Sequence, residues 1–216
     1  MVVAGAGRVT CIDRVASKAP CGKAYGACPV LAATVQCAMN PLKYLLAYPA
    51  DLQAQVRRIM DGKGLAVFLR DKYPVAHGVR SDRALFQYVS GLKGEYLRNA
   101  EPVDKVLFDS KIHVVKHALG LHTAHSRVQG SRLKASHEIR IASVFRDSPP
   151  EFLRMIAVHE LAHLKEREHD KAFYKLCGHM EPDYHQLEFD VRLYLTHLDH
   201  TGERLWAGDG SRNTTE

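Results

Sequence analysis

The chain lacks several features that would place a protein quickly in a class. No apolar run approaches the roughly 18–20 residues that a membrane-spanning helix needs, so no membrane partner is expected. No two cysteines have the CxxC spacing of a zinc ribbon, and of the 5 cysteines only Cys177 lies beyond residue 38. A single thiol in the body of the chain suits a reducing cytoplasm. The run AGAGRV lacks the third glycine of a dinucleotide-binding loop, and no Walker loop is present.

Charge is also modest. The 216 residues carry a formal net charge of +6, which permits an anionic substrate without requiring nucleic acid, and no nucleic-acid partner is predicted. The length suits one well-buried core. Oligomeric state has no signature in the composition.

Three regions differ in composition. Residues 1–38 are rich in Ala, Gly, Val and Cys and show no helical or strand period. We expect a disordered extension, a processed leader or a misassigned start, and favour the last, with Met39 as the first residue. Residues 39–198 carry regular apolar periodicity and form the predicted domain. Residues 199–216 are polar and contain glycine, which predicts a flexible tail.

The predicted elements are helices, then a small antiparallel sheet, then helices, which is an α+β domain. The β-rich runs VDKVLFD and KIHVVKH flank Asp109-Ser110, typical of a hairpin turn, and LHTAHSRV and EIRIASVF predict two more strands. The sequence S-P-P-E at 148–151 predicts a capping box, with proline at the first position of a helix. Asp170 is placed to cap the next helix.

Within that first helix, residues 159–163 read HELAH. His159 and His163 are four residues apart, so both imidazoles lie on one helical face and can converge on one tetrahedral cation. Glu160 can reach a metal-bound water without being a ligand. This HExxH pattern predicts a zinc site in which Glu160 is the base that activates the water.

A catalytic zinc needs a third protein ligand and one open position. The residues leave three candidates open: His169 just past the helix end, then Glu188 from a separate element, and Glu166 from the same face. A closed, structural site would need a fourth ligand such as Cys177 or His179. The glutamate inside HExxH has no purpose in such a site, which favours catalysis.

A basic stretch precedes the HExxH helix. Four basic residues lie on or between the two strands before it, and as a group near a metal they make a triphosphate substrate plausible. Each alone is as readily a solvated position on a sheet. The strand itself could instead pair with an extended peptide. The four residues are Arg127, Arg132, Lys134 and Arg140.

From about Met39 to His197 the chain resembles the YgjP family of metal-dependent hydrolases, which are small bacterial proteins also named UTP pyrophosphatases. The matching stretches are LRNAEPVDKVLFDSKIHVVKHALGLHTAHSRVQG, RMIAVHELAHLKEREHDKAFYKLC and HMEPDYHQLEFDVRLYL. The resemblance implies a zincin-like metallopeptidase fold, zinc at His159, His163 and His169, and Glu160 as the base. It also supports Met39 as the start.

The function that the resemblance implies is cytoplasmic hydrolysis of UTP to UMP and diphosphate. The residues themselves support only metal-activated water attacking an electrophile. A zinc metallopeptidase that acts on a peptide substrate is the first alternative, and a non-catalytic zinc-binding module is the second. Nickel, cobalt and manganese also suit a histidine site.

Overall fold

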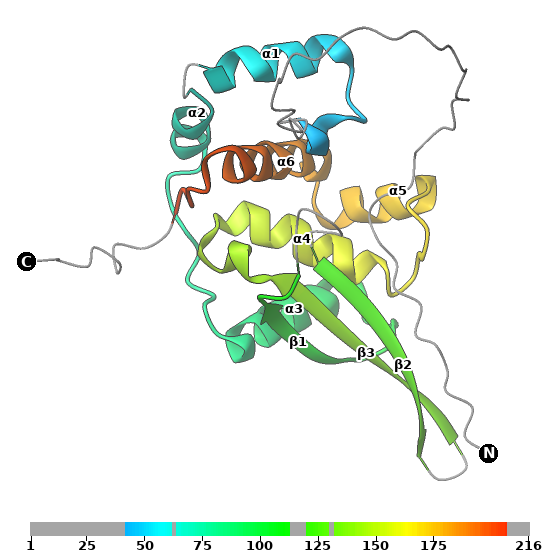
Figure 1. Ribbon diagram of the computed structural model, residues 1–216. Helices are drawn as coiled ribbons and strands as arrows, with labels where there is room; N and C mark the ends of the chain where they lie inside the picture. Colours follow the sequence, from blue (N-terminus) through cyan, green and yellow to red (C-terminus); the bar gives the residue numbers. More distant parts are fainter. Residues whose placement is uncertain (1–41, 62–63, 113–119, 130–131, 207–216) are drawn as a thin grey trace, which may run out of the picture.

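The computed structural model describes residues 42–61, 64–112, 120–129 and 132–206. The predicted extension 1–38 and residues 113–117 of the run KIHVVKH lie outside these ranges. The order of elements is helices, sheet, helices, so the chain is α+β as predicted (Figure 1). The elements are η1 (Lys43–Leu45), α1 (Ala50–Asp61), α2 (Gly64–Lys72), α3 (Asp82–Tyr96), β1 (Val103–Asp109), β2 (Gly120–Gln129), β3 (Arg132–Ala142), η2 (Ser143–Asp147), α4 (Pro150–Ala162), α5 (Lys171–Met180) and α6 (Tyr184–Thr201). None of the described helices has the length and apolar character needed to cross a membrane.

The sheet is mixed, with the strand order β1–β3–β2. β2 and β3 are antiparallel, as expected. β1 runs parallel to β3, with Val106 opposite Ile139 and Phe108 opposite Ile141, so the prediction of an antiparallel sheet is wrong for this pair. β2 is the next described strand after β1 in the chain, but it is not the neighbour of β1 in the sheet, because β3 lies between them. Apolar alternation predicts a strand, but it does not identify the partner of that strand.

Helix α4 begins with a different cap from the one predicted. Its N-cap is Pro149, and no side chain caps the helix, so the capping-box prediction is wrong. The Ser148 hydroxyl is fully buried and donates instead to the carbonyl of Phe145, at 2.9 Å, in the preceding turn η2. Proline still stands at the start of the helix, where its missing N–H costs nothing.

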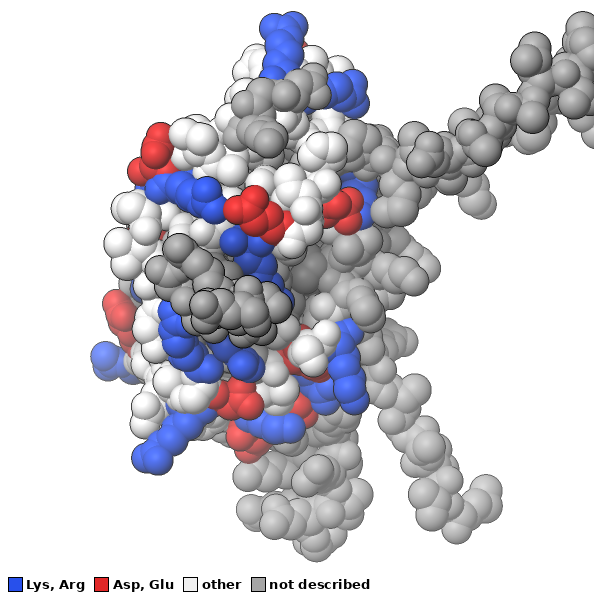
Figure 2. Space-filling model, turned by 60° about the vertical axis from the view of Figure 1, so that its left-hand side comes forward, with Lys and Arg blue, Asp and Glu red and all other residues white. Residues whose placement is uncertain are grey.

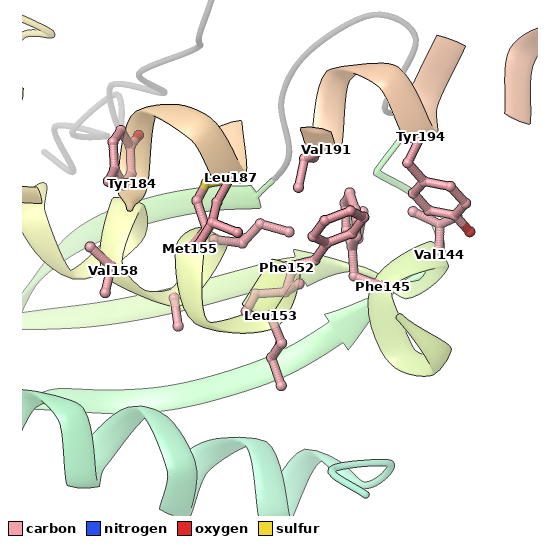
Figure 3. Packing of buried hydrophobic residues seen from close by; sticks show 14 of the residues in the cluster. Val144, Phe145, Phe152, Leu153, Met155, Val158, Tyr184, Leu187, Val191 and Tyr194 are labelled. Carbon is pink, nitrogen blue, oxygen red and sulfur yellow. The ribbon is translucent and has the colours of Figure 1, made fainter. Parts of the chain in front are cut away.

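Helix α4 lies between the sheet and α6 and is buried along most of its length (Figure 1). Figure 3 shows the packing: Phe152 and Met155 of α4 face Leu187 and Val191 of α6. Burial on several sides explains why α4 is apolar around most of its circumference rather than along one stripe. The polar residues at its C-terminal end therefore lie inside the protein.

The last described residues pack against this core. Residues 199–206, which the sequence places in a flexible tail, contain the end of α6, and Trp206 is buried. The indole N–H of Trp206 donates to the carbonyl of Tyr73 at 2.7 Å, and its ring lies 5.5 Å from the ring of Phe152. Residues 199–206 therefore pack against the core, whereas residues 207–216 of the predicted tail lie outside the described ranges.

We expect Phe152→Ala to lower the free energy of unfolding by about 3–5 kcal/mol, because it leaves a cavity among packed rings. Phe152 is 0% exposed and contacts the rings of Tyr73, Tyr194 and Trp206. Chemical denaturation measures the change. Phe86→Ala is the matched control, since Phe86 is 37% exposed and should change stability little. Equal losses in both variants would contradict this account of the core.

Candidate active site

Three histidines from two segments meet at the C-terminal end of α4. His159 lies in the last turn of α4, His163 is the C-cap residue with right-handed helical backbone, and His169 precedes α5. One nitrogen atom of each imidazole lies within 4.8 Å of the corresponding atoms of the other two. The Phe173 ring lies against all three imidazoles, with centroid distances of 4.9, 4.7 and 4.7 Å.

Local structure explains how His169 returns to the end of α4. The backbone N–H groups of Lys165 and Glu166 donate to the carbonyl of Ala162, at 3.0 and 2.9 Å, and close a turn directly after the helix. Asp170 then caps α5 as predicted, because its carboxylate accepts from the N–H of Phe173 at 3.0 Å. The turn and the cap together place His169 opposite His159, with their Nε2 atoms 3.2 Å apart.

Hydrogen bonds orient two of the rings. Nδ1 of His163 donates to the carbonyl of Glu166 at 2.9 Å, because a carbonyl can only accept. Nδ1 of His159 lies 2.6 Å from the Tyr184 hydroxyl. Both contacts engage Nδ1 and leave Nε2 for the centre of the cluster. Metal-binding histidines are commonly oriented by such contacts with the distal ring nitrogen.

The cluster has the protonation that metal binding requires. Burial lowers the pKa of His159 well below its usual value, and His163 and His169 lower it further. Burial also lowers the pKa of His163 and of His169. Neutral imidazole is the form that coordinates a cation. Three neutral nitrogen donors within 4.8 Å of one another fit a divalent transition metal.

Glu160 stands beside this cluster in the last turn of α4 and is only 2% exposed. Burial raises the pKa of its carboxyl to about 8. Among the described residues, no hydrogen bond to this carboxylate is formed. A cation held by the histidines would favour the ionised form and lower this pKa. Glu160 is therefore a carboxylate that only a neighbouring positive charge keeps ionised at neutral pH.

The other candidate ligands have different positions. Within the described ranges, the group of His, Cys, Asp and Glu side chains close enough to share an ion consists of the three histidines. Glu188 is ion-paired with Arg192 at 2.8 Å. Glu166 contributes its backbone carbonyl to His163. Cys177 is buried, and the exposed His179 contacts the edge of a tyrosine ring. The arrangement therefore favours His169 as the third ligand.

The four basic residues of the predicted phosphate site lie on the neighbouring strands β2 and β3. Arg140 donates to Glu138 at 2.9 Å and to Asp109 at 3.2 Å, so it joins β3 to β1. Arg127 and Lys134 are paired across the β2–β3 ladder, and Arg132 lies opposite Gln129. These three positions lie toward the far end of the hairpin, which extends beyond the helices (Figure 1).

An arginine that sequence reasoning did not select lies beside the cluster. Arg192 of α6 lowers the pKa of both His159 and His169 through its charge, although burial is the larger cause in each. It donates to Glu188 at 2.8 Å and to the carbonyl of Tyr44 at 3.3 Å. The sequence marks Arg192 only by its spacing of four residues from Glu188, which is typical of any ion pair on a helix and does not indicate a functional site. On the face of the molecule shown in Figure 2, Lys and Arg side chains are interspersed with Asp and Glu side chains.

Comparisons with known proteins agree with this site. Residues 108–191, from the end of β1 into α6, match the family described as YgjP-like, metallopeptidase domain. The chain belongs to the YgjP-like family and is a metal-dependent hydrolase. A protein of Escherichia coli (strain K12) named UTP pyrophosphatase is 60% identical over 160 residues, covering 74% of this chain and 96% of that protein. No solved structure matches the chain significantly.

Proposed function

We propose that the chain is a zinc-dependent nucleotide hydrolase that converts UTP and water to UMP and diphosphate. The proposal rests on the cluster of His159, His163 and His169 beside buried Glu160, in a chain 60% identical to a protein named UTP pyrophosphatase. An α+β domain with this helix is what a zincin-like metallopeptidase fold would contain. The three histidines are the proposed metal ligands.

His159, His163 and His169 would hold the divalent metal, which would supply a water of lowered pKa and polarise an oxygen of the electrophile. Glu160 accepts the proton of the attacking water and orients it toward phosphorus. Its burial and its lack of a described hydrogen-bond partner support this role, because no other group competes for the carboxylate. Burial keeps His159 and His163 neutral by lowering the pKa of both rings, and the contacts of their Nδ1 atoms orient them.

Arg192 is a basic residue whose charge acts on two of the three histidines, His159 and His169. The nearby carboxylates are Glu188, which is ion-paired with Arg192, and Glu168, whose charge acts on His163 and His169. Arginine binds phosphate oxygens in a bidentate manner. We infer that Arg192 contacts the phosphate chain.

The direct test is to measure bound metal and then follow diphosphate release from UTP, with and without a chelator. Release that depends on the metal, with UMP as the second product, is the expected result. The peptidase alternative comes from the family description, and a peptide-library digest tests it with the same preparation. Metal-dependent cleavage of peptides, together with no release of diphosphate, would replace the nucleotide proposal.

We expect Arg192→Gln to raise the KM for UTP by about 10–100-fold, because a hydrogen bond to a charged group contributes roughly 1.5–3 kcal/mol. Steady-state kinetics with metal-loaded protein measure the effect. Arg154→Gln is the matched control, since Arg154 is also partly buried and ion-paired, with Glu181, but its charge does not shift the pKa of any of the three histidines.

The double variant Arg127→Ala, Arg132→Ala separates the two candidate phosphate sites. A larger rise in KM in that variant than in Arg192→Gln would move the phosphate contacts to the β2–β3 hairpin. An unchanged KM in all of these variants would remove the phosphate role from both groups of arginines.

A further inference from the structure

Tyr184 is a buried polar group in contact with a proposed metal ligand. It is the first residue of α6, and its side chain is 0% exposed. Its hydroxyl lies 2.6 Å from Nδ1 of His159, on the ring edge that faces away from the other two histidines. The two ring planes are nearly parallel, with an interplanar angle of 11°. The 2.6 Å distance indicates one strong hydrogen bond between the hydroxyl and the imidazole.

The direction of this hydrogen bond decides which nitrogen of His159 can bind a cation. If Nδ1 carries the proton and donates to Tyr184, the lone pair is on Nε2, which faces His169 at 3.2 Å. If Tyr184 donates to Nδ1, the proton is on Nε2 and blocks the centre of the cluster. Only the first arrangement is compatible with a metal held by all three histidines.

We propose that Tyr184 is a positioning residue: its hydroxyl oxygen accepts the Nδ1–H of His159 and so holds this ring in the Nδ1–H tautomer. This inference rests on the metal role of His159 in the proposed function. The corresponding partner of His163 is the carbonyl of Glu166, which is also uncharged. A carboxylate in either place would raise the basicity of the ligand. Two neutral partners leave more of the positive charge of the metal available to the water and the substrate.

Affinity for Zn²⁺, measured by competition with a chromogenic chelator on the full chain, tests the proposal. Tyr184→Phe removes one oxygen atom and should weaken binding by about 10–100-fold, the usual effect of losing such a partner. Tyr194→Phe is the matched control: Tyr194 is a buried tyrosine of the same helix whose ring contacts are with Phe145, Phe152 and Trp206. Equal affinities for the parent and both variants would overturn the proposal.

A measurement on the unsubstituted protein is decisive even if Tyr184→Phe does not fold. Long-range ¹H–¹⁵N correlation spectra of the Zn²⁺-loaded chain report which ring nitrogen carries the proton. The signals of His159 can be assigned through its ring contacts with Phe173 and Tyr184. A proton on Nδ1, with Nε2 bound to the metal, supports the proposal, and an unprotonated Nδ1 contradicts it.

Neither measurement uses UTP, so the two proposals can fail separately. Weaker Zn²⁺ binding in Tyr184→Phe, together with no hydrolysis of UTP by the parent, would keep the positioning role and reject the substrate. Hydrolysis of UTP by the parent, with equal affinity in all three proteins, would reject only the positioning role.

Discussion

Glu160→Gln should lower kcat for diphosphate release from UTP by about 10²–10⁴-fold, the usual contribution of a general base. Glutamine has nearly the same shape but cannot accept the proton of the attacking water. Bound metal should be unchanged, because the three histidines near Glu160 supply the proposed ligands. Pre-steady-state measurement of diphosphate on metal-loaded protein distinguishes the loss of the chemical step from a loss of substrate binding.

Glu166→Gln is the matched control for this substitution. Glu166 lies in the turn after α4, and its contribution to the cluster is a backbone carbonyl that the substitution leaves in place. Its kcat should therefore equal that of the parent protein. If Glu160→Gln kept the parent rate with metal bound, proton transfer by Glu160 would not be part of the reaction. Release of diphosphate would then have to come from another site.

The second large effect concerns the third ligand. His169→Ala should abolish tight metal binding, with a loss of affinity beyond the roughly 10–100-fold that outer partners of a ligand usually contribute. A metal that binds only the folded state stabilises it by about 2.7 kcal/mol at 100 times its Kd. The rise in Tm on adding Zn²⁺ should therefore disappear in His169→Ala. Thermal unfolding with and without Zn²⁺ measures this increment.

Glu188→Gln is the informative comparison, because Glu188 is the other candidate for the third ligand. It breaks a partly buried ion pair with Arg192, so it should lower Tm to a similar extent with and without metal. The increment on adding Zn²⁺ should remain. The reverse pattern, with the increment lost in Glu188→Gln and kept in His169→Ala, would assign the third ligand to Glu188.

Features that depend on interactions within a few residues of the chain, such as helical spacing and helix caps, could be predicted from the sequence. His159 and His163 are adjacent on one turn whatever the rest of the chain does, since helical spacing fixes their separation. Asp170 caps α5 through its own backbone neighbours. These two features predicted two histidines on one helical face with Glu160 beside them, and they made His169 the first of three candidates for the third ligand.

Tertiary packing decided the features that join distant segments. Tyr184 approaches His159, and Arg192 approaches the cluster, because α6 packs along α4, and no sequence spacing encodes that approach. Trp206 packs into the core and donates a hydrogen bond to the carbonyl of Tyr73, which is 133 residues away in the chain. β3 lies between β1 and β2 because of strand pairing. The energy of pairing depends on the side chains of the neighbouring strand as well as on those of the strand itself. The sequence by itself therefore determined the reactive groups, and only the tertiary structure decided what surrounds and orients them.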